Sequence, residues 1–394
     1  MRLILISLDA ISQTDVDRLY SLPTLSMLRQ EGVFCSNMTT VYPTLTYPIH
    51  ATLLTGCFPD RHGIGHNQPF QPDTPPQMRR WHWEIGDIRV PTLHQAAREA
   101  GGRVASVLWP VTGKNPYVRY CFPEVLPLPG ENAVLKMLRY ASPLWILEME
   151  ARYGRLRRGA RQPYLDDFAV RIVQHLLSAR RAPDLTTLHL VDLDAMRHQY
   201  GTESDEAHAA MARLDKRLGD IVHTLKETHR WDDTLLCVVS DHGHRDAPRG
   251  VFLDAMLEKA GVGRAQSLGM GAFIFSDCPE RALAALEENR TRWHIGHIYQ
   301  NEELRALHAA PEVTLAVDAE DGCCFIDEAE VTHGEHGFSP DYPQARATAL
   351  FVGSVFASGA TLSAARAVDI APTLAQAMGW RLPDTDGRPL DVFR

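Results

Sequence analysis

The chain has 394 residues, 45% of them hydrophobic and 23% charged, so its composition excludes a disordered, collagen-like or coiled-coil protein. The 40 Lys and Arg residues are outnumbered by 49 Asp and Glu residues, and the formal net charge of −9 argues against binding of duplex nucleic acid. The seven cysteines are scattered without a Cys-x-x-Cys pair, which predicts free thiols rather than a disulfide framework or a cysteine zinc site.

Short apolar runs alternate with helical patterns along the chain. The first run, at residues 3–8, predicts a buried strand. It is too short to cross a membrane and no small-residue cleavage site follows it, so we expect a cytoplasmic protein without a membrane segment. Further strands are predicted at residues 104–108, 186–191, 234–239 and 348–352. Helices are predicted at residues 24–31, 93–100, 211–225 and 370–378. This alternation predicts an α/β fold with a mostly parallel sheet flanked by helices on both faces.

Two stretches interrupt the alternation, and we interpret them as insertions on the sheet core. Residues 111–165 carry Pro, Tyr, Trp and a basic patch, which suits a lid. Residues 250–330 combine a glycine-rich turn, a strand at 272–275, a helix at 280–289 and two more short strands, which suits a small α/β cap. The core would then be formed by residues 1–110, 166–249 and 331–394. The sequence leaves open a homodimer formed through the insertions.

Acidic residues and histidines follow three of the predicted strands. Asp9 comes after the first strand, Asp194 and His198 come after the third, and Asp241-His242 come after the fourth. The carboxyl ends of parallel strands meet at one edge of a sheet, where ligands bind. A turn or a helix cap would explain any one of these residues. Three strands that end this way indicate a site for zinc or a similar dication, because carboxylate and imidazole groups are suitable ligands.

A second stretch carries a candidate nucleophile. Residues 42–56 read YPTLTYPIHATLLTG, and a helix is expected to begin near Pro48 because Pro is favoured at the first helical position. Thr46 would then lie just before the helix N-terminus, where amide N–H groups attract a phosphoryl oxygen. A dication next to its hydroxyl would lower the pKa and make Thr46 a nucleophile. Considered without its neighbours, Thr46 would instead be expected to be the helix N-cap.

Six segments in this order closely resemble the nucleotide pyrophosphatase/phosphodiesterase family of the alkaline phosphatase superfamily. They are Tyr42–Asn67, Asp194–Gly201, Ser240–Gly243, Gly334–Phe338, Val368–Thr373 and Asp386–Leu390. The resemblance covers more than half of the chain, and it implies an alkaline-phosphatase-like core with cap insertions.

The resemblance implies two divalent metal ions, which are usually zinc in this family. The ligands of one ion would be Asp194, His198 and His336. The ligands of the other would be Asp9, Asp241, His242 and the Thr46 oxygen. For His336 the competing assignment is His333, but the Gly-Phe that follows His336 matches the family pattern. Asp and His ligands also accept manganese, so the sequence leaves the metal open. Asn67 and the backbone N–H of Tyr47 would bind a non-bridging phosphoryl oxygen.

The resemblance also implies a two-metal hydrolase of small phosphate esters, nucleotides among them. The nucleophile segment favours a phosphodiesterase or nucleotide pyrophosphatase that forms a phosphothreonine at Thr46. The alternative is a phosphomonoesterase or phosphonate hydrolase, with Arg197 or Lys114 as the extra charge for a dianion. A sulfatase is disfavoured, because the stretch from Thr46 to His50 lacks the Cys or Ser and the Arg of that motif.

Two positions depart from the family pattern. Arg197 stands where the family often has Gly, and it would either contact phosphate or point to solvent. His244 stands where the family commonly has Met, and it would either support the metal ligands or the substrate or be an incidental surface histidine. The aromatic residues Trp81 and Trp83 are open to two interpretations, stacking on a base or packing in the core.

Overall fold

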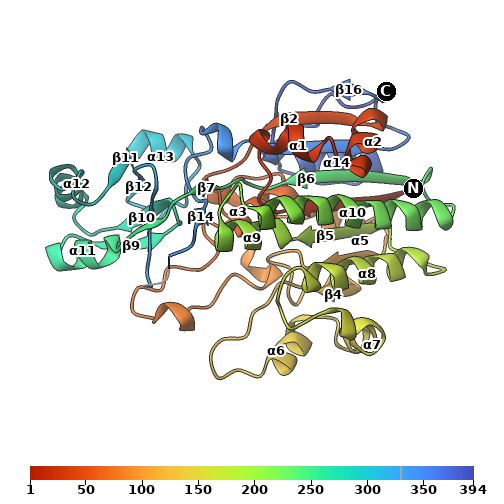
Figure 1. Ribbon diagram of the computed structural model, residues 1–394, viewed down its shortest axis with the longest axis horizontal. Coiled ribbons are helices and arrows are strands. Elements are labelled where there is room, and N and C mark those ends of the chain that lie inside the picture. The colour runs from red at the N-terminus through yellow and green to blue at the C-terminus, as the bar shows by residue number, and fades with distance from the viewer. Residues whose placement is uncertain (329–330) are drawn as a thin grey trace.

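The computed structural model describes residues 1–328 and 331–394, and its centre is a nine-stranded sheet (Figure 1). The strand order is β16-β2-β15-β6-β1-β5-β3-β4, and β17 also pairs with β2. The bounds are β1 (Arg2–Leu8), β2 (Val33–Thr39), β3 (Val104–Val107), β4 (Tyr120–Phe122), β5 (Leu185–Leu190), β6 (Thr234–Ser240), β15 (Ala347–Val352), β16 (Ala360–Thr361) and β17 (Ala365–Arg366). Only β15 runs antiparallel to its neighbours in this sheet, so the predicted mostly parallel sheet is confirmed.

Helices cover both faces of the sheet, because its strands are apolar on both sides. Along β1, Ile4 and Ile6 face one hydrophobic cluster, while Leu3 and Leu5 face another. The first cluster is closed by α2 (Pro23–Glu31), α8 (Tyr164–Ser178) and α10 (Asp205–Glu227). The second is closed by α3 (Thr46–Thr55), α5 (Leu93–Glu99) and α14 (Ile370–Met378). Figure 1 shows this three-layer arrangement, which is the predicted fold class.

The segment 250–330 forms a separate small sheet to one side of the core, in cyan and teal in Figure 1; positions 329 and 330 lie outside the described residues. Its order is β11-β12-β10-β9, and every pairing is antiparallel. Its elements are α11 (Leu253–Ala260), β9 (Arg264–Ser267), β10 (Gly271–Phe275), α12 (Pro279–Glu288), β11 (Ile295–Gln300), α13 (Asn301–Ala306) and β12 (Leu315–Ala319). A hydrophobic cluster of its own lies between this sheet and its helices.

The segment 111–165 contains α6 (Ala133–Tyr140) and α7 (Pro143–Tyr153), which project from the core in Figure 1. It also contains β4, which pairs in parallel with β3 and forms an edge of the central sheet. Short elements complete the described chain: α1 (Val16–Leu19), α4 (Pro59–His62), α9 (Asp192–Tyr200), β7 (Arg245–Asp246), β8 (Arg249–Val251), β13 (Cys323–Phe325) and β14 (Gly334–Glu335). No helix among the described residues is both long enough and apolar enough to cross a membrane.

Candidate active site

The sheet brings the predicted site residues to the carboxyl edge of its central strands. Asp9 follows β1 and Asp241 follows β6, and these strands pair in parallel with Leu8 opposite Ser240. On the other side of β1 lies β5, and α9, which carries Asp194, begins shortly after it. Residues far apart in the sequence therefore meet because their strands are neighbours in the sheet.

Thr46 is the first residue of α3, and its hydroxyl group faces this edge. Every other residue of α3 is buried, whereas Thr46 is partly exposed. Its Oγ1 lies 3.2 Å from His242 Nε2. The N-cap position belongs to Leu45, so Thr46 does not cap the helix through its side chain. The hydroxyl is thus free for chemistry at a helix N-terminus, where the backbone N–H groups and the helix dipole favour an anionic ligand.

Asp9, Asp241 and His242 form a buried group at the start of α3. His242 Nε2 lies 3.5 Å from Asp9 Oδ1 and 3.4 Å from Asp241 Oδ2. The other two carboxylate oxygens are held in place: Asp241 Oδ1 accepts hydrogen bonds from the backbone N–H groups of Ala10 and His242, and Asp9 Oδ2 lies 3.0 Å from His189 Nε2. One oxygen of each carboxylate, Asp9 Oδ1 and Asp241 Oδ2, has no hydrogen-bond donor among the residues that the structure describes.

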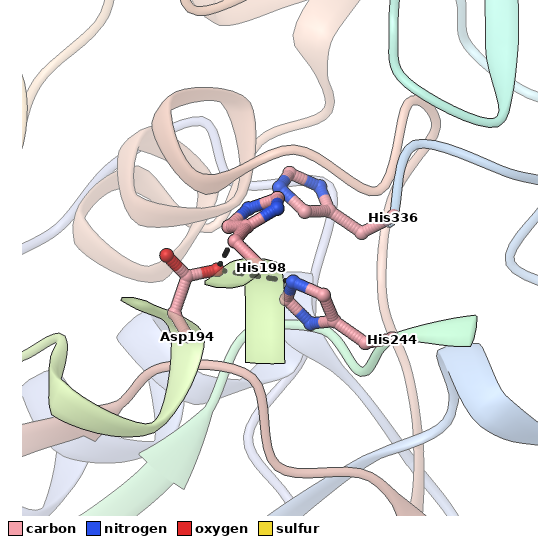
Figure 2. Close-up of side chains that lie close together, drawn as sticks. All are labelled: Asp194, His198, His244 and His336. Atoms are coloured by element: carbon pink, nitrogen blue, oxygen red, sulfur yellow. Dashed lines mark ion pairs between the residues drawn. The ribbon is translucent and has the colours of Figure 1, made fainter. Parts of the chain in front are cut away.

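Asp194, His198 and His336 form a second group, and His244 lies among them (Figure 2). The Nε2 atoms of His198 and His244 each lie 3.3 Å from Asp194 Oδ1. The ring of His336 stacks on the ring of His242, with centroids 3.9 Å apart and planes 15° apart. The two groups are therefore adjacent parts of one site.

Backbone carbonyl groups fix the orientation of two of these imidazoles. The Nδ1–H of His198 donates to the carbonyl oxygen of Gly334 at 2.8 Å, and the Nδ1–H of His336 donates to that of Thr44 at 2.9 Å. With Nδ1 bonded in this way, Nε2 is the nitrogen of each ring that can lose its proton and face a ligand, the arrangement usual for metal-bound histidines. His333, the competing candidate, is exposed and lies outside the group.

The charges of the site are strongly perturbed. Burial, together with the neighbouring Asp241, raises the pKa of Asp9 well above its usual value, and burial also raises the pKa of Asp241. Burial lowers the pKa of His242 to about 3 and that of His336 to about 4. Although burial alone would lower it, the charge of Asp194 raises the pKa of His198 to about 10. Burial therefore disfavours the ionised carboxylates of the first group, and a positive charge close to them would stabilise that form.

The donor sets of the two groups suit divalent cations. A buried carboxylate oxygen without a donor is costly, and three of them, Asp9 Oδ1, Asp194 Oδ1 and Asp241 Oδ2, point into the site. A cation in each group would satisfy the oxygens of that group. Mixed carboxylate and imidazole ligands are those that zinc and related dications accept.

Asn67 lies beside the nucleophile. The backbone N–H of Tyr47 donates to Asn67 Oδ1 at 2.9 Å, so the two groups expected to meet phosphate are bonded to each other, with the Asn67 side-chain oxygen as acceptor. The backbone N–H of His82 donates to the Asn67 carbonyl oxygen and brings the adjacent Trp81 close, whose ring centroid lies 5.2 Å from that of Tyr47. The Asn67 side chain is thereby fixed at the start of α3.

The two positively charged side chains that could have bound a phosphate dianion, Arg197 and Lys114, pair with carboxylates instead. Arg197 is buried and neither contacts the candidate phosphate site nor points to solvent, because its guanidinium pairs with Asp15 and the Ala10 carbonyl group. Lys114 Nζ lies 2.6 Å from Glu84 Oε1. Both side chains therefore support the structure around the site instead of lining it.

The sequence motifs did not point to two histidines of this region, His189 and His50. His189 lies in β5 and reaches Asp9, and His50 lies in α3 and donates through Nδ1 to the Thr46 carbonyl oxygen. The only signal for His189 was a polar residue inside an apolar strand. His244 was noticed, but it was not assigned to the metal group that it joins.

The fold and this site define a metal-dependent phosphate-ester hydrolase of the alkaline phosphatase superfamily. A sequence profile of the type I phosphodiesterase/nucleotide pyrophosphatase family matches residues 3–339. The chain therefore belongs to this family, which confirms the resemblance seen in its motifs, and it is an enzyme of the phosphodiesterase and nucleotide pyrophosphatase class.

The relatives are distant in sequence, and the two described next match over most of their own length. Mouse ectonucleotide pyrophosphatase/phosphodiesterase family member 7 is 24% identical over 98% of this chain and 85% of its own length. Bovine bis(5'-adenosyl)-triphosphatase ENPP4 is 22% identical over 98% of this chain and 80% of its own. Among solved structures, murine ectonucleotide pyrophosphatase/phosphodiesterase 5 has a TM-score of 0.72 at 20% identity, covering 98% of this chain and 97% of its own. An inactive threonine-to-alanine variant of that murine protein has been solved in complex with AMP.

Proposed function

We propose that the chain hydrolyses phosphodiester or phosphoanhydride bonds of small nucleotides, with Thr46 as the nucleophile. The observation that carries the proposal is the position of Thr46 Oγ1 at the N-terminus of α3, 3.2 Å from His242 Nε2 in the group that also contains Asp9 and Asp241. Two divalent cations, zinc in our proposal, would be held by Asp9, Asp241, His242 and Thr46, and by Asp194, His198 and His336. When bound, such cations lower the pKa of a nearby hydroxyl group and polarise phosphoryl oxygens.

The chain's own residues would carry the reaction in two steps. Thr46 Oγ forms a bond to phosphorus, loses its proton to solvent, and the bond to the leaving oxygen breaks as that oxygen is protonated. Water then cleaves the phosphothreonine, releases the phosphate monoester and restores the hydroxyl group. Asn67 and the first N–H groups of α3 would stabilise charge on the phosphoryl oxygens, and each such donor is worth about 3 kcal/mol in the transition state.

One feature of the structure supports a diester over the alternative monoester. The cations suggested for a dianion, Arg197 and Lys114, are paired with Asp15 and Glu84. For a nucleotide, the support comes from a relative named as a bis(5'-adenosyl)-triphosphatase and from a solved neighbour in complex with AMP. Trp81, half-buried beside Asn67 and Tyr47, offers an aromatic surface on which a base could stack.

The test compares substrates on metal-reconstituted protein. Bis-p-nitrophenyl phosphate and a p-nitrophenyl nucleotide ester should be hydrolysed much faster than p-nitrophenyl phosphate or phosphonoacetate. Thr46→Ala should abolish turnover with metal content near normal, and the matched variant Thr46→Ser should retain part of it. Wild-type rates in metal-loaded Thr46→Ala would refute the nucleophile, and monoester turnover far above diester turnover would refute the substrate class.

We also propose a reducing, cytoplasmic compartment. All seven cysteines are free, and six of them are buried. Unpaired thiols spread through a chain are typical of proteins in a reducing environment. Fractionation of cells that produce the protein tests this proposal, and its recovery outside the cytoplasm would contradict it.

A further inference from the structure

His244 carries a buried imidazole that the proposed reaction does not use. Its side chain is 0% exposed, and neither ring nitrogen has a hydrogen-bond partner among the described residues. Each buried polar atom left in this way costs about 1–3 kcal/mol. An imidazole kept at that cost is expected to meet a partner that is not part of the protein.

The ring points into the group formed by Asp194, His198 and His336 (Figure 2). Its Nε2 lies 3.3 Å from Asp194 Oδ1, the same distance as the Nε2 of His198. Its ring centroid lies 4.6 Å from that of His198 and 5.0 Å from that of His336. Three imidazoles and one carboxylate oxygen therefore surround a common point.

The backbone fixes this position. β7 and β14 pair antiparallel, with Gly334 opposite Asp246 and Glu335 opposite Arg245, and the same register continued by one residue sets His336 opposite His244. Gly243 allows the chain to turn from β6 into this ladder, since a Cβ there would lie 2.2 Å from the Gln344 carbonyl oxygen. The pairing of β7 with β14 therefore places the imidazoles of His244 and His336 next to each other in the site.

We infer that His244 is a fourth protein ligand of the cation held by Asp194, His198 and His336. The inference rests on the proposed metal site and extends it. Imidazole and carboxylate groups are the ligands that zinc accepts, and a catalytic zinc can expand to five ligands, so four protein ligands still leave a position for the phosphoryl oxygen. A nitrogen-rich set disfavours manganese and magnesium, which prefer oxygen ligands. His244 would therefore make this group more selective for zinc than the oxygen-rich group of Asp9 and Asp241.

The alternative role is a hydrogen bond from His244 to Asp194 without metal contact. The two roles differ in magnitude, because loss of an outer hydrogen bond to a metal ligand costs about 10- to 100-fold in metal affinity. Loss of a ligand should exceed that range. His244→Gln sharpens the distinction, since a glutamine amide can still donate to Asp194 but offers no imidazole nitrogen.

The experiment measures zinc affinity and stoichiometry of the full chain by chelator competition. In both His244→Ala and His244→Gln, one of the two zinc ions should bind more than about 100-fold more weakly than in the wild type. His189→Ala, which removes the contact to Asp9, should stay within that range, and His333→Ala, on the surface, should change nothing. A loss of about 100-fold or less in His244→Gln would overturn the inference.

Two further measurements separate this inference from the proposed function. His336→Ala should also lose zinc; if it does not, the metal site itself is wrong, whereas loss in His336→Ala alone refutes only the role of His244. A crystal structure of the zinc-loaded wild type needs no folded variant. It should place His244 Nε2 about 2.1 Å from the ion, and a separation above about 3 Å would overturn the inference.

Discussion

Replacing Arg197 with methionine should destabilise the protein strongly, because Arg197 joins the two halves of the site. It lies on α9 with Asp194 and His198, and it pairs with Asp15 and the Ala10 carbonyl group, just beyond Asp9. Arg197 is 2% exposed and Asp15 is 4% exposed. The pair is therefore sheltered from the solvent that screens surface ion pairs.

The expected loss is about 3–5 kcal/mol, the usual cost of leaving one partner of a buried pair uncompensated. The backbone N–H and hydroxyl group of Ser12 also donate to Asp15, which places the loss near the lower end. Even so, this is a large share of the roughly 5–15 kcal/mol by which a domain is stable. Arg197→Met with Asp15→Leu should recover most of the loss, because no buried charge remains.

Urea unfolding of the single and double variants measures these free energies. The matched control is Arg152→Met, whose exposed pair with Glu148 should be worth no more than about 0.5 kcal/mol. Equal losses in Arg197→Met and Arg152→Met would refute the buried-pair argument. Unchanged stability with a raised KM for the diester would instead mean that Arg197 binds phosphate.

Two further predictions concern residues that take no part in the proposed reaction. Gly243→Ala should cost about 1–3 kcal/mol in unfolding free energy and lower zinc content, since the new Cβ would overlap the Gln344 carbonyl oxygen. Gly86→Ala, where a Cβ meets nothing within 4 Å, is the control, and a similar loss in both would contradict this reason. Burial raises the pKa of Asp318 from 3.8 to about 6, so ionisation disfavours the folded state and stability should fall as pH rises through this interval. Asp318→Asn should therefore gain stability relative to the wild type between about pH 4 and pH 6, and a difference that does not vary with pH in urea unfolding would show the assignment to be wrong.

The parts of the candidate site that lie in short sequence motifs could be predicted from the sequence. The order of the motifs and the placement of Asp9 and Asp241 directly after apolar strands needed no knowledge of the fold. The choice of His336 over His333 also followed from adjacent residues, and the structure brings His336 alone into the group. These features can be predicted because the residues next to a strand end or a helix start already indicate where it lies.

Other parts depended on residues that are remote in the chain. β2 was not predicted, because Ser36 and Asn37 interrupt its apolar pattern; its place in the sheet comes from pairing with β15. The partner of Arg197 is separated from it by 182 positions, so nothing near Arg197 in sequence points to Asp15. The sequence offered phosphate or solvent for this guanidinium, and the fold supplies a buried carboxylate instead.

The sequence by itself determined the fold class, the family and the strand-end carboxylates. Apolar periodicity and short motifs involve residues that are close together in the chain, so they can be recognised without the fold. Only the tertiary structure decided how the histidines are used. His189 reaches Asp9 because β5 and β1 are neighbours, and His244 meets Asp194 because the β7–β14 ladder crosses the end of α9. Strand order and register decide which side chains lie next to each imidazole. Both are set by the packing of the whole sheet, so they cannot be read from neighbouring residues.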